Sequence, residues 1–222
     1  MPAEHKSFFL APEAAEYLIA HGTPPDPILE RLTEETRQLG DISRMQISHE
    51  QGAFMELLTH VLAPRFAVEV GTFTGYSALC VARGLPPGGR LLCCDTSEDW
   101  TSVAQRYWAE AGVVDRIELR LGPAIETLRG LPQEPIIDLA FIDADKTGYI
   151  DYYEEIVLRL SDRAVVIVDN VLQDGAVLTE ERADENRSLT AIREFNRHVA
   201  ADSRTHAVML PVADGLTFLR KR

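Results

Sequence analysis

The segment from Phe66 to Ser77 constrains the fold of this chain more than any other segment. It reads FAVEVGTFTGYS, in which an apolar run is followed by a glycine turn and then by the start of a helix. Gly71 and Gly75 let the backbone approach a ligand closely, and the first turn of a helix offers unpaired N–H groups. We therefore expect a strand, a tight turn and a helix that together build a nucleotide pocket.

Glu69 narrows the choice of ligand for this pocket. A dinucleotide-binding G-x-G-x-x-G motif would have its first glycine at this position. We expect Glu69 to end its strand, where a carboxylate repels a pyrophosphate and favours a ligand with positive charge or hydroxyl groups. S-adenosylmethionine fits, because it carries an ammonium, a sulfonium and a ribose diol but no phosphate.

From residue 66 onward, apolar runs alternate with helical stretches. Uninterrupted apolar runs are typical of parallel strands that helices cover on both faces. The expected strands are Ala67–Val70, Arg90–Cys94, Ile117–Leu121, Ile137–Ile142 and Ala164–Val168, and the helices between them are Tyr76–Gly84, Trp100–Ala111, Ile125–Leu131 and Tyr149–Leu160. This alternation predicts an α/β fold with a doubly wound, mostly parallel, Rossmann-like sheet.

The C-terminal part predicts a different strand arrangement. A helix at Ser188–Ala200 precedes two strands, Thr205–Leu210 and Leu216–Leu219, which are separated by an Asp214-Gly215 turn. Such a turn favours an antiparallel hairpin. The sheet is therefore expected to have seven strands and to finish with this hairpin.

Residues 1–65 are predicted to be helical. Helices are expected at Glu13–Ala20, after Asp26 as a cap with Pro27 in the first turn, and at His49–Leu62 after Ser48, with Gln51 at the capping-box position. The 222 residues are interpreted as one domain: residues 1–65 are a helical segment that forms part of the cofactor and acceptor site, and residues 66–222 are the α/β core. The acidic stretch Leu172–Arg187 is expected to be a mobile loop near the active site.

The charge of the chain restricts its partners. A net charge of −13 disfavours nucleic acid and anionic membranes, and to a lesser degree multiply phosphorylated substrates. No apolar run approaches the roughly 18 residues that span a bilayer, and Met1–Ala20 is too acidic for a signal peptide. Cys80, Cys93 and Cys94 lie in apolar runs and are expected to be reduced core thiols. We therefore expect a cytoplasmic protein without a nucleic-acid or membrane partner.

Acidic residues stand at the ends of four predicted strands. They are Glu69, Asp95, Asp143 and Asp169. Each one alone could be a helix cap or a turn residue, but in open parallel sheets ligands bind beyond the carboxyl ends of the strands. Asp95 follows Gly71 at close to the roughly 20-residue spacing of a ribose-binding carboxylate. The four acids together indicate a ligand site at this edge of the sheet.

Three oxygen ligands are expected to meet at neighbouring strand ends, namely those of Asp143, Asp169 and Asn170. Oxygen ligands suit Mg²⁺, whereas no cysteine and histidine spacing indicates zinc. Lys146 follows Asp143 closely enough to point back at the same strand end. A metal and a sulfonium beside it would lower the pKa of the Lys146 ammonium and make it a candidate general base, although an ordinary surface lysine is the alternative.

An ordered set of motifs resembles the cation-dependent O-methyltransferases related to caffeoyl-CoA and catechol O-methyltransferases. The resemblance extends from about Leu39 to the C-terminus. It rests on residues 45–52 (MQISHEQG), 69–77 (EVGTFTGYS), 141–146 (FIDADK), 168–172 (VDNVL), 192–196 (IREFN) and 210–217 (LPVADGLT). The chain departs from the family at His49, where proline is common, and at Ser161-Asp162-Arg163, a predicted turn without the usual Gly-Gly.

This resemblance implies a class I enzyme that uses S-adenosylmethionine. It implies cofactor contacts from Ile47, Glu69, Gly71, Thr72, Ser77, Asp95, Ala124 and Asp145. It also implies a divalent cation, expected to be Mg²⁺, on Asp143, Asp169 and Asn170, with Asp143 and Lys146 as catalytic residues and Lys146 as the base. The expected reaction is O-methylation of a vicinal aromatic diol, a small phenolic molecule, by a homodimeric enzyme.

Other functions compete with this expectation. A CoA-thioester phenol is the alternative acceptor, but the acidic composition favours a smaller, free phenol. A nicotinamide-dependent oxidoreductase shares the fold, but Glu69 and the missing G-x-G-x-x-G motif argue against it. A non-catalytic cofactor-binding protein would not need Asp143, Lys146, Asp169 and Asn170 together. The identity of the acceptor stays open, because residues 1–38 and Leu172–Arg187, which would shape its pocket, carry little family information.

Overall fold

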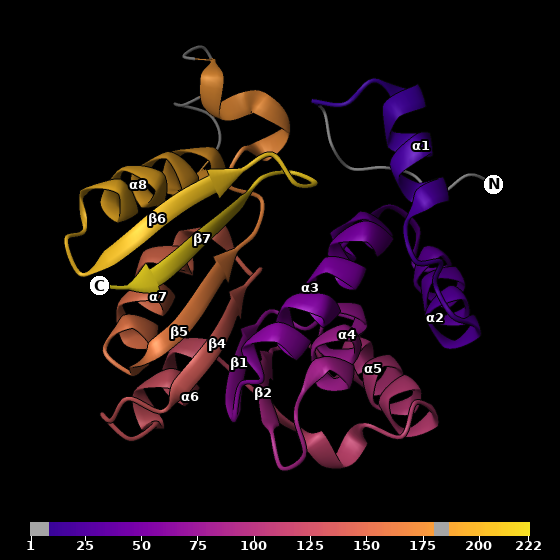
Figure 1. The fold of residues 1–222 in the computed structure, drawn as a ribbon, viewed down its shortest axis with the longest axis horizontal. Coiled ribbons are helices and arrows are strands. Elements are labelled where there is room, and N and C mark those ends of the chain that lie inside the picture. Colours follow the sequence, from indigo (N-terminus) through magenta and orange to yellow (C-terminus); the bar gives the residue numbers. More distant parts are fainter. Residues whose placement is uncertain (1–8, 180–186) are drawn as a thin grey trace.

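Seven strands form one sheet in the computed structural model, which describes residues 9–179 and 187–222 (Figure 1). The spatial order of the strands is β3-β2-β1-β4-β5-β7-β6. The strands are β1 (Phe66–Val70), β2 (Arg90–Asp95), β3 (Ile117–Leu121), β4 (Ile137–Ile142), β5 (Leu160–Val168), β6 (Thr205–Leu210) and β7 (Leu216–Lys221). The first five are parallel, and β7 runs antiparallel to both β5 and β6, which confirms the predicted fold.

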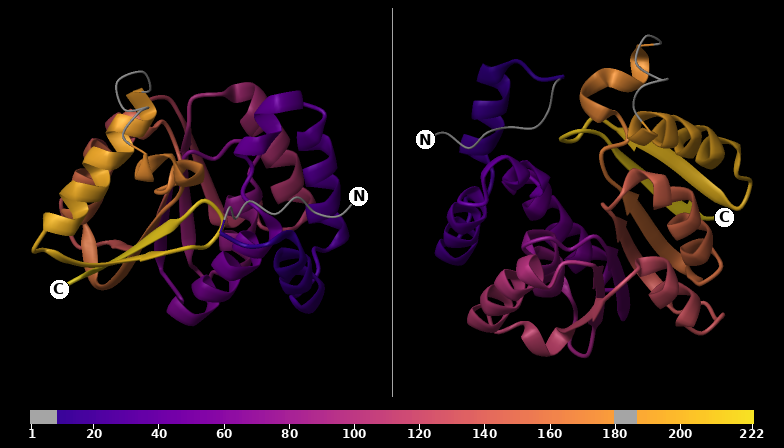
Figure 2. Two further views of the ribbon diagram at one scale, coloured as in Figure 1. Left: turned by 90° about the horizontal axis from the view of Figure 1, so that it is seen from above. Right: turned by 180° about the vertical axis from the view of Figure 1, so that it is seen from behind.

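Helices cover both faces of the sheet (Figures 1 and 2). One layer contains α3 (His49–Leu62), α4 (Tyr76–Gly84) and α5 (Glu98–Glu110), and the other contains α6 (Ala124–Gly130), α7 (Tyr149–Val157) and α8 (Arg187–Ala201). Because side chains alternate along a strand, Val68 and Val70 join the core under α6–α8, whereas Ala67 joins the core under α3–α5. Two buried faces explain the uninterrupted apolar runs. Among the described residues, no helix has the length and apolar character to cross a bilayer.

The helical N-terminal segment consists of α1 (Pro12–His21), α2 (Pro27–Arg37), the 3-10 helix η1 (Gly40–Met45) and α3. Asp26 caps α2 as predicted, with its Oδ1 accepting the N–H groups of Ile28 and Leu29. Helix α2 packs Leu29 and Leu32 into the core of α4 and α5. The segment is thereby held beside the glycine turn that follows β1.

The structure corrects one predicted turn. Ser161, Asp162 and Arg163 lie inside β5, which begins at Leu160, and α7 accordingly ends at Val157. The Ser161 hydroxyl donates a 2.7 Å hydrogen bond to Asp138 on β4, which holds the start of β5 in the sheet. Asp162 and Arg163 are exposed there. A polar, solvent-facing strand start was therefore mistaken for a turn.

The carboxyl ends of β1, β4 and β5 are level with one another. The N–H of Asp143 bonds the carbonyl of Val70 at 2.9 Å, and the N–H of Asp169 bonds the carbonyl of Ile142 at 3.0 Å. The chain leaves β1 toward β2 on one side, while β4 lies on the other side, so the strand order reverses here. This is the place where open α/β sheets bind ligands.

Candidate functional site

A cavity of about 1730 Å³ opens over the carboxyl ends of the parallel strands. The predicted site residues that line it are Ile47, Gly71, Thr72, Ser77, Asp95, Ala124, Asp143, Asp145, Lys146, Asp169 and Asn170. Glu69 is the predicted residue that is not part of the lining. The first turn of η4 (Gln173–Leu178) adds further lining residues from the loop predicted at Leu172–Arg187. Residues 180–186 of that loop lie outside the described residues, so the predicted mobility is not tested for them.

The turn after β1 requires glycine at two positions. Gly71 has a φ of +89°, and a Cβ on it would lie 2.0 Å from the carbonyl oxygen of Asp143. Gly75 has a φ of +85°, and a Cβ on it would lie 2.5 Å from the Cβ of Ala104. Trp108 donates its Nε1–H to the carbonyl of Gly75 at 3.1 Å, which holds the turn against α5. At Gly71 and Gly75 the backbone of the turn therefore lies closer to the end of β4 and to α5 than a residue with a Cβ atom would allow.

Asp95 organises this turn from the end of β2. Its Oδ2 accepts the N–H groups of Thr72 at 2.9 Å and Phe73 at 2.8 Å, and its Oδ1 accepts the N–H of Ser97 at 2.8 Å. Phe73 itself has a φ of +51°. Asp95 lines the cavity as the ribose prediction requires, and it also fixes the backbone of the turn.

Glu69 does not end its strand, contrary to the prediction. Strand β1 continues through Val70, and the Glu69 side chain is 1% exposed. Cys93 donates its thiol hydrogen to Oε2 at 3.4 Å, and Oε1 has no hydrogen-bond partner within the described part of the chain. Burial raises the pKa of Glu69 to about 8, an increase that the side chains of Ser77, Cys93 and Thr72 oppose. Glu69 thus lies in the protein interior beneath the turn.

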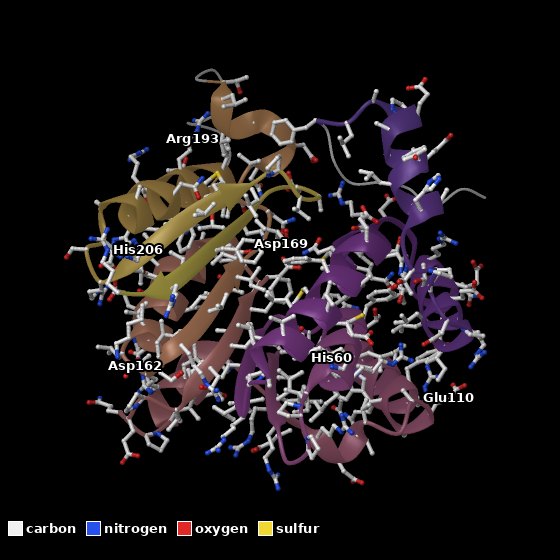
Figure 3. All side chains as sticks on the ribbon, viewed as in Figure 1. His60, Glu110, Asp162, Asp169, Arg193 and His206 are labelled. Atoms are coloured by element: carbon white, nitrogen blue, oxygen red, sulfur yellow. The ribbon has the colours of Figure 1, made fainter. Side chains whose placement is uncertain are left out.

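Asp143, Asp169 and Asn170 meet at the neighbouring ends of β4 and β5. The Lys146 ammonium lies among them and donates to Asp143 Oδ1 at 3.1 Å and to Asn170 Oδ1 at 2.6 Å. Its third bond, at 2.6 Å, goes to the hydroxyl of Tyr149. Figure 3 shows Asp169 in the middle of the molecule, between the strand ends and helix α3. The prediction that these four residues meet at the carboxyl ends of neighbouring strands is therefore correct.

The electrostatics of this cluster suit a hard cation. Burial and, to a lesser degree, the nearby Asp143 carboxylate raise the pKa of Asp169 to about 7, although hydrogen bonds from Gln51 and Asn170 and the charge of Lys146 oppose the increase. The donor set consists of two carboxylates and one amide oxygen, which are the ligands that Mg²⁺ prefers. The Lys146 ammonium touches two of the three residues, so their oxygens face one centre of positive charge. The residues present therefore fit a divalent cation.

Asp145 and Trp100 line the same cavity. Tyr152 donates its hydroxyl to Asp145 Oδ1 at 2.6 Å, and Thr147 donates to Asp145 Oδ2 at 3.0 Å. Trp100 packs edge-on against Phe73, with the ring centroids 5.1 Å apart. The aromatic rings of Trp100 and Phe73 beside the Asp145 carboxylate suit a nucleoside that carries a positively charged group.

Three polar residues of the site were missed or misread from the sequence: Gln51, Tyr149 and Tyr152. Gln51 was assigned to a capping box, and its backbone N–H does reach Ser48 Oγ at 3.4 Å. Its side chain, however, donates Nε2–H to Asp169 Oδ2 at 2.7 Å. Tyr149 follows Lys146 by about one helical turn, a spacing that could have revealed their contact. No pattern in the neighbouring sequence predicts the contact between Gln51 and Asp169.

A second cluster of side chains that could bind a metal ion lies away from the cavity and consists of Glu154, His198 and Asp202. Arg204 donates to Glu154 Oε1 at 2.7 Å and to Asp202 Oδ2 at 2.6 Å. The Arg204 guanidinium holds the pKa of Asp202 well below its usual range. The cluster is therefore an ion-pair network in which arginine supplies the positive charge.

Comparison with known proteins gives one consistent result. A family model described as O-methyltransferase matches residues 20–222. The chain is 38% identical over 208 residues to a probable caffeoyl-CoA O-methyltransferase 1 of Dictyostelium discoideum, with 92% of this chain and 90% of the relative covered. An O-methyltransferase from Bacillus cereus, solved in complex with SAH, matches with a TM-score of 0.84 and 29% identity over 95% of this chain and 97% of that one. The O-methyltransferase TomG from Streptomyces achromogenes, solved in complex with SAM, matches with a TM-score of 0.84 and 28% identity over 94% and 96% of the two chains.

Proposed function

The chain belongs to the O-methyltransferase family, and on that premise we propose that it methylates one hydroxyl of a catechol-type acceptor with S-adenosylmethionine and a divalent cation. The observation that carries this proposal is the meeting of Asp143, Lys146, Asp169 and Asn170 in the cavity that the glycine turn also lines. A donor site and an acceptor site then share one chamber, as methyl transfer requires.

The cofactor half of the site is proposed to consist of Ile47, Gly71, Thr72, Ser77, Asp95, Ala124 and Asp145. Asp145 and Asp95 supply negative charge and hydrogen-bond acceptors for an ammonium group and a ribose. Glu69 is proposed to support the turn from beneath Thr72 and Ser77 without reaching the cavity, since it is buried. Ile47 comes from the N-terminal segment, which we propose forms one domain with the α/β core. Relatives solved with SAM and SAH support this assignment.

Asp143, Asp169 and Asn170 are proposed to hold the cation, expected to be Mg²⁺. When bound, the cation would lower the pKa of the acceptor hydroxyls and fix their position. Asp143 and Asp169 would balance its charge. This assignment follows from the oxygen-only donor set and from the positive charge that these oxygens already face in Lys146.

Lys146 is proposed to act as the neutral amine, which takes the proton from the hydroxyl that is methylated and becomes the ammonium. Its ammonium is held by Asp143, Asn170 and Tyr149, so the side chain is oriented into the cluster. The deprotonated acceptor oxygen attacks the methyl carbon, a new C–O bond forms, and the C–S electron pair returns to sulfur. A general base of this kind accelerates a reaction by roughly 10²–10⁴-fold.

Two classes of phenolic acceptor remain in competition. Six aspartates line the cavity, namely Asp95, Asp143, Asp145, Asp169, Asp174 and Asp214. Their negative charge favours a free catechol over a CoA ester with several phosphates. The relative named as a probable caffeoyl-CoA O-methyltransferase is the observation that favours the CoA ester.

A homodimer is proposed as the assembled form. Apolar side chains are exposed on α3 and on the edge strand β6, including Val61 at 74% and Val208 at 56% exposure. An edge strand with exposed apolar residues is a site for association. A second copy of the chain would cover this surface.

Methylation of a panel of catechols and one caffeoyl-type CoA ester, with and without Mg²⁺, tests the proposed function. Mass spectrometry of the products gives the acceptor class and the methylated position. We expect Mg²⁺-dependent transfer, lost in EDTA and reduced at least about a hundredfold by Asp169→Ala. The variant should retain S-adenosylmethionine binding in calorimetry. Full activity in excess EDTA would show that the reaction does not need a divalent cation.

A further inference from the structure

Gln51 is a buried polar residue that the mechanism above does not use. Its side chain is 1% exposed, on the first turn of α3, and donates Nε2–H to Asp169 Oδ2 at 2.7 Å. The two residues are 118 positions apart in the chain. The bond therefore joins the N-terminal segment to the end of β5, where the acceptor half of the site lies.

Two hydrogen bonds set the orientation of the Asp169 carboxylate. Asn170 donates its backbone N–H to Oδ1 at 2.6 Å, and Gln51 donates to Oδ2 at 2.7 Å. One donor on each oxygen defines the plane of the group and removes its rotational freedom. An ionised carboxylate accepts about four hydrogen bonds or ligands, so capacity remains on both oxygens.

The same helix start also borders the cofactor side of the cavity. Ile47 lies just before α3 and lines the cavity together with Gln51. Ser48 caps the helix between them and fixes their relative position. Any displacement of this segment therefore moves the Gln51 amide relative to Asp169.

We propose that Gln51 is a positioning residue for the cation site: its amide holds the Asp169 carboxylate in the orientation that binds the cation, and it couples that orientation to the docking of the N-terminal segment. This inference rests on the proposed cation-dependent function. An uncharged amide suits the role because it donates a hydrogen bond without adding charge to the ligand set. Partners of this kind typically contribute about 10–100-fold to metal affinity.

Titration of the purified protein with Mn²⁺ alone tests the inference. Electron paramagnetic resonance of the free ion gives the dissociation constant without any turnover. Gln51→Leu removes the donor, and Gln51→Asn keeps the amide but shortens its reach. Both variants should raise the Mn²⁺ dissociation constant by about tenfold or more. They should also raise the Mn²⁺ concentration that gives half-maximal methylation more than they lower kcat at saturating Mn²⁺.

Thr36→Val is the matched control. Thr36 is buried on α2 and donates its hydroxyl to Thr74 at 2.9 Å, so it ties α2 to the core, and not the start of α3 that carries Gln51. It makes no contact with Asp169. The control should lower the melting temperature to a degree similar to the Gln51 variants and leave the Mn²⁺ dissociation constant unchanged.

Two outcomes overturn the inference, and they differ in what else they affect. If both Gln51 variants lose thermal stability but bind Mn²⁺ like the wild type, Gln51 only attaches α3 to the sheet, and the proposed function is untouched. If the wild type itself does not bind Mn²⁺, the cation role of Asp169 fails together with that of Gln51.

Discussion

Burial is the largest cause of the raised pKa of two carboxylates, Glu69 and Asp169, and the nearby Asp143 is the second largest cause only for Asp169. Glu69 is raised to about 8 chiefly by burial, and one of its oxygens has no hydrogen-bond partner among the described residues. Asp169 is raised to about 7 by burial and by the neighbouring Asp143. A nearby cation would reverse the second effect but would have little influence on the first. At the scale of single residues, Asp169 is therefore suited to bind a cation and Glu69 is suited to stay protonated in the interior.

The buried state of Glu69 makes folding stability depend on pH. Its pKa of about 8 in the folded protein lies above the ordinary value of 4.5, so the folded protein holds this proton more tightly than the unfolded chain. The contribution of this proton to stability is complete below about pH 4.5 and is lost as pH rises through 8.

Glu69→Gln should remove this dependence. Urea unfolding in EDTA at pH 5.5 and 8.5 should show the wild type losing stability relative to the variant on the order of a few kcal/mol. Comparison with the variant cancels the contribution of Asp169, which both proteins share. Parallel pH profiles for the two proteins would contradict the assignment.

The turn between β1 and α4 joins the two halves of the site at the scale of secondary-structure elements. Gly71 approaches the backbone of Asp143, which begins the cation cluster, and Asp95 holds the N–H groups of Thr72 and Phe73. Movement of this turn would therefore disturb the cofactor half and the end of β4 together.

Gly71→Ala should damage this turn more than backbone strain alone can explain. Its Cβ would lie 2.0 Å from a backbone oxygen, which cannot move away as a flexible side chain would. Gly88→Ala is the control, because Gly88 has a φ of +79° but no atom within 4 Å of its added Cβ. The control should cost about 1–2 kcal/mol through its positive φ.

Thermal denaturation with and without S-adenosylmethionine separates the two effects. Gly71→Ala should have the lower melting temperature and lose the stabilisation by cofactor, whereas Gly88→Ala should keep it. Equal behaviour of the two variants would show that the close approach to Asp143 does not matter.

The elements themselves were largely predictable from local patterns. The caps at Asp26 and Ser48 and the order of strands and helices follow from neighbouring residues, and the structure confirms them. The start of β5 was not predicted because Asp162 and Arg163 are polar and exposed; they belong to the strand because Leu160 and Val165, on either side of them, pair with Ile137 and Leu139 of β4. Pairing is a contact with a distant segment, which local periodicity does not contain.

At the scale of the whole molecule, helix α3 and the edge strand β6 both carry exposed apolar side chains. Leu57 and Val61 on α3 and Val208 and Leu210 on β6 are all exposed. Strand β6 is at the edge of the sheet, so its outer hydrogen-bonding groups are available to another chain. These features support the proposed homodimer.

Val208→Lys should convert the dimer to a monomer. Light scattering after size-exclusion chromatography measures the mass directly, and circular dichroism checks that the variant is folded. Leu121→Lys is the control, since Leu121 is 49% exposed on β3 at the opposite edge of the sheet. The control should remain dimeric. A monomeric wild type, or a dimeric Val208→Lys variant, would contradict the proposed interface.

The sequence by itself determined the fold class, the order of elements and the set of acids near the strand ends. These features are encoded locally, in the periodicity of apolar residues, in glycines that need positive φ and in motifs of a few residues. Only the tertiary structure decided which acid reaches the cavity and which side chain holds Asp169. The first depends on where β1 ends. The strand continues to Val70, so Glu69 is a residue within the strand and its side chain is buried in the interior. The second depends on a contact between residues 51 and 169, which no local pattern records.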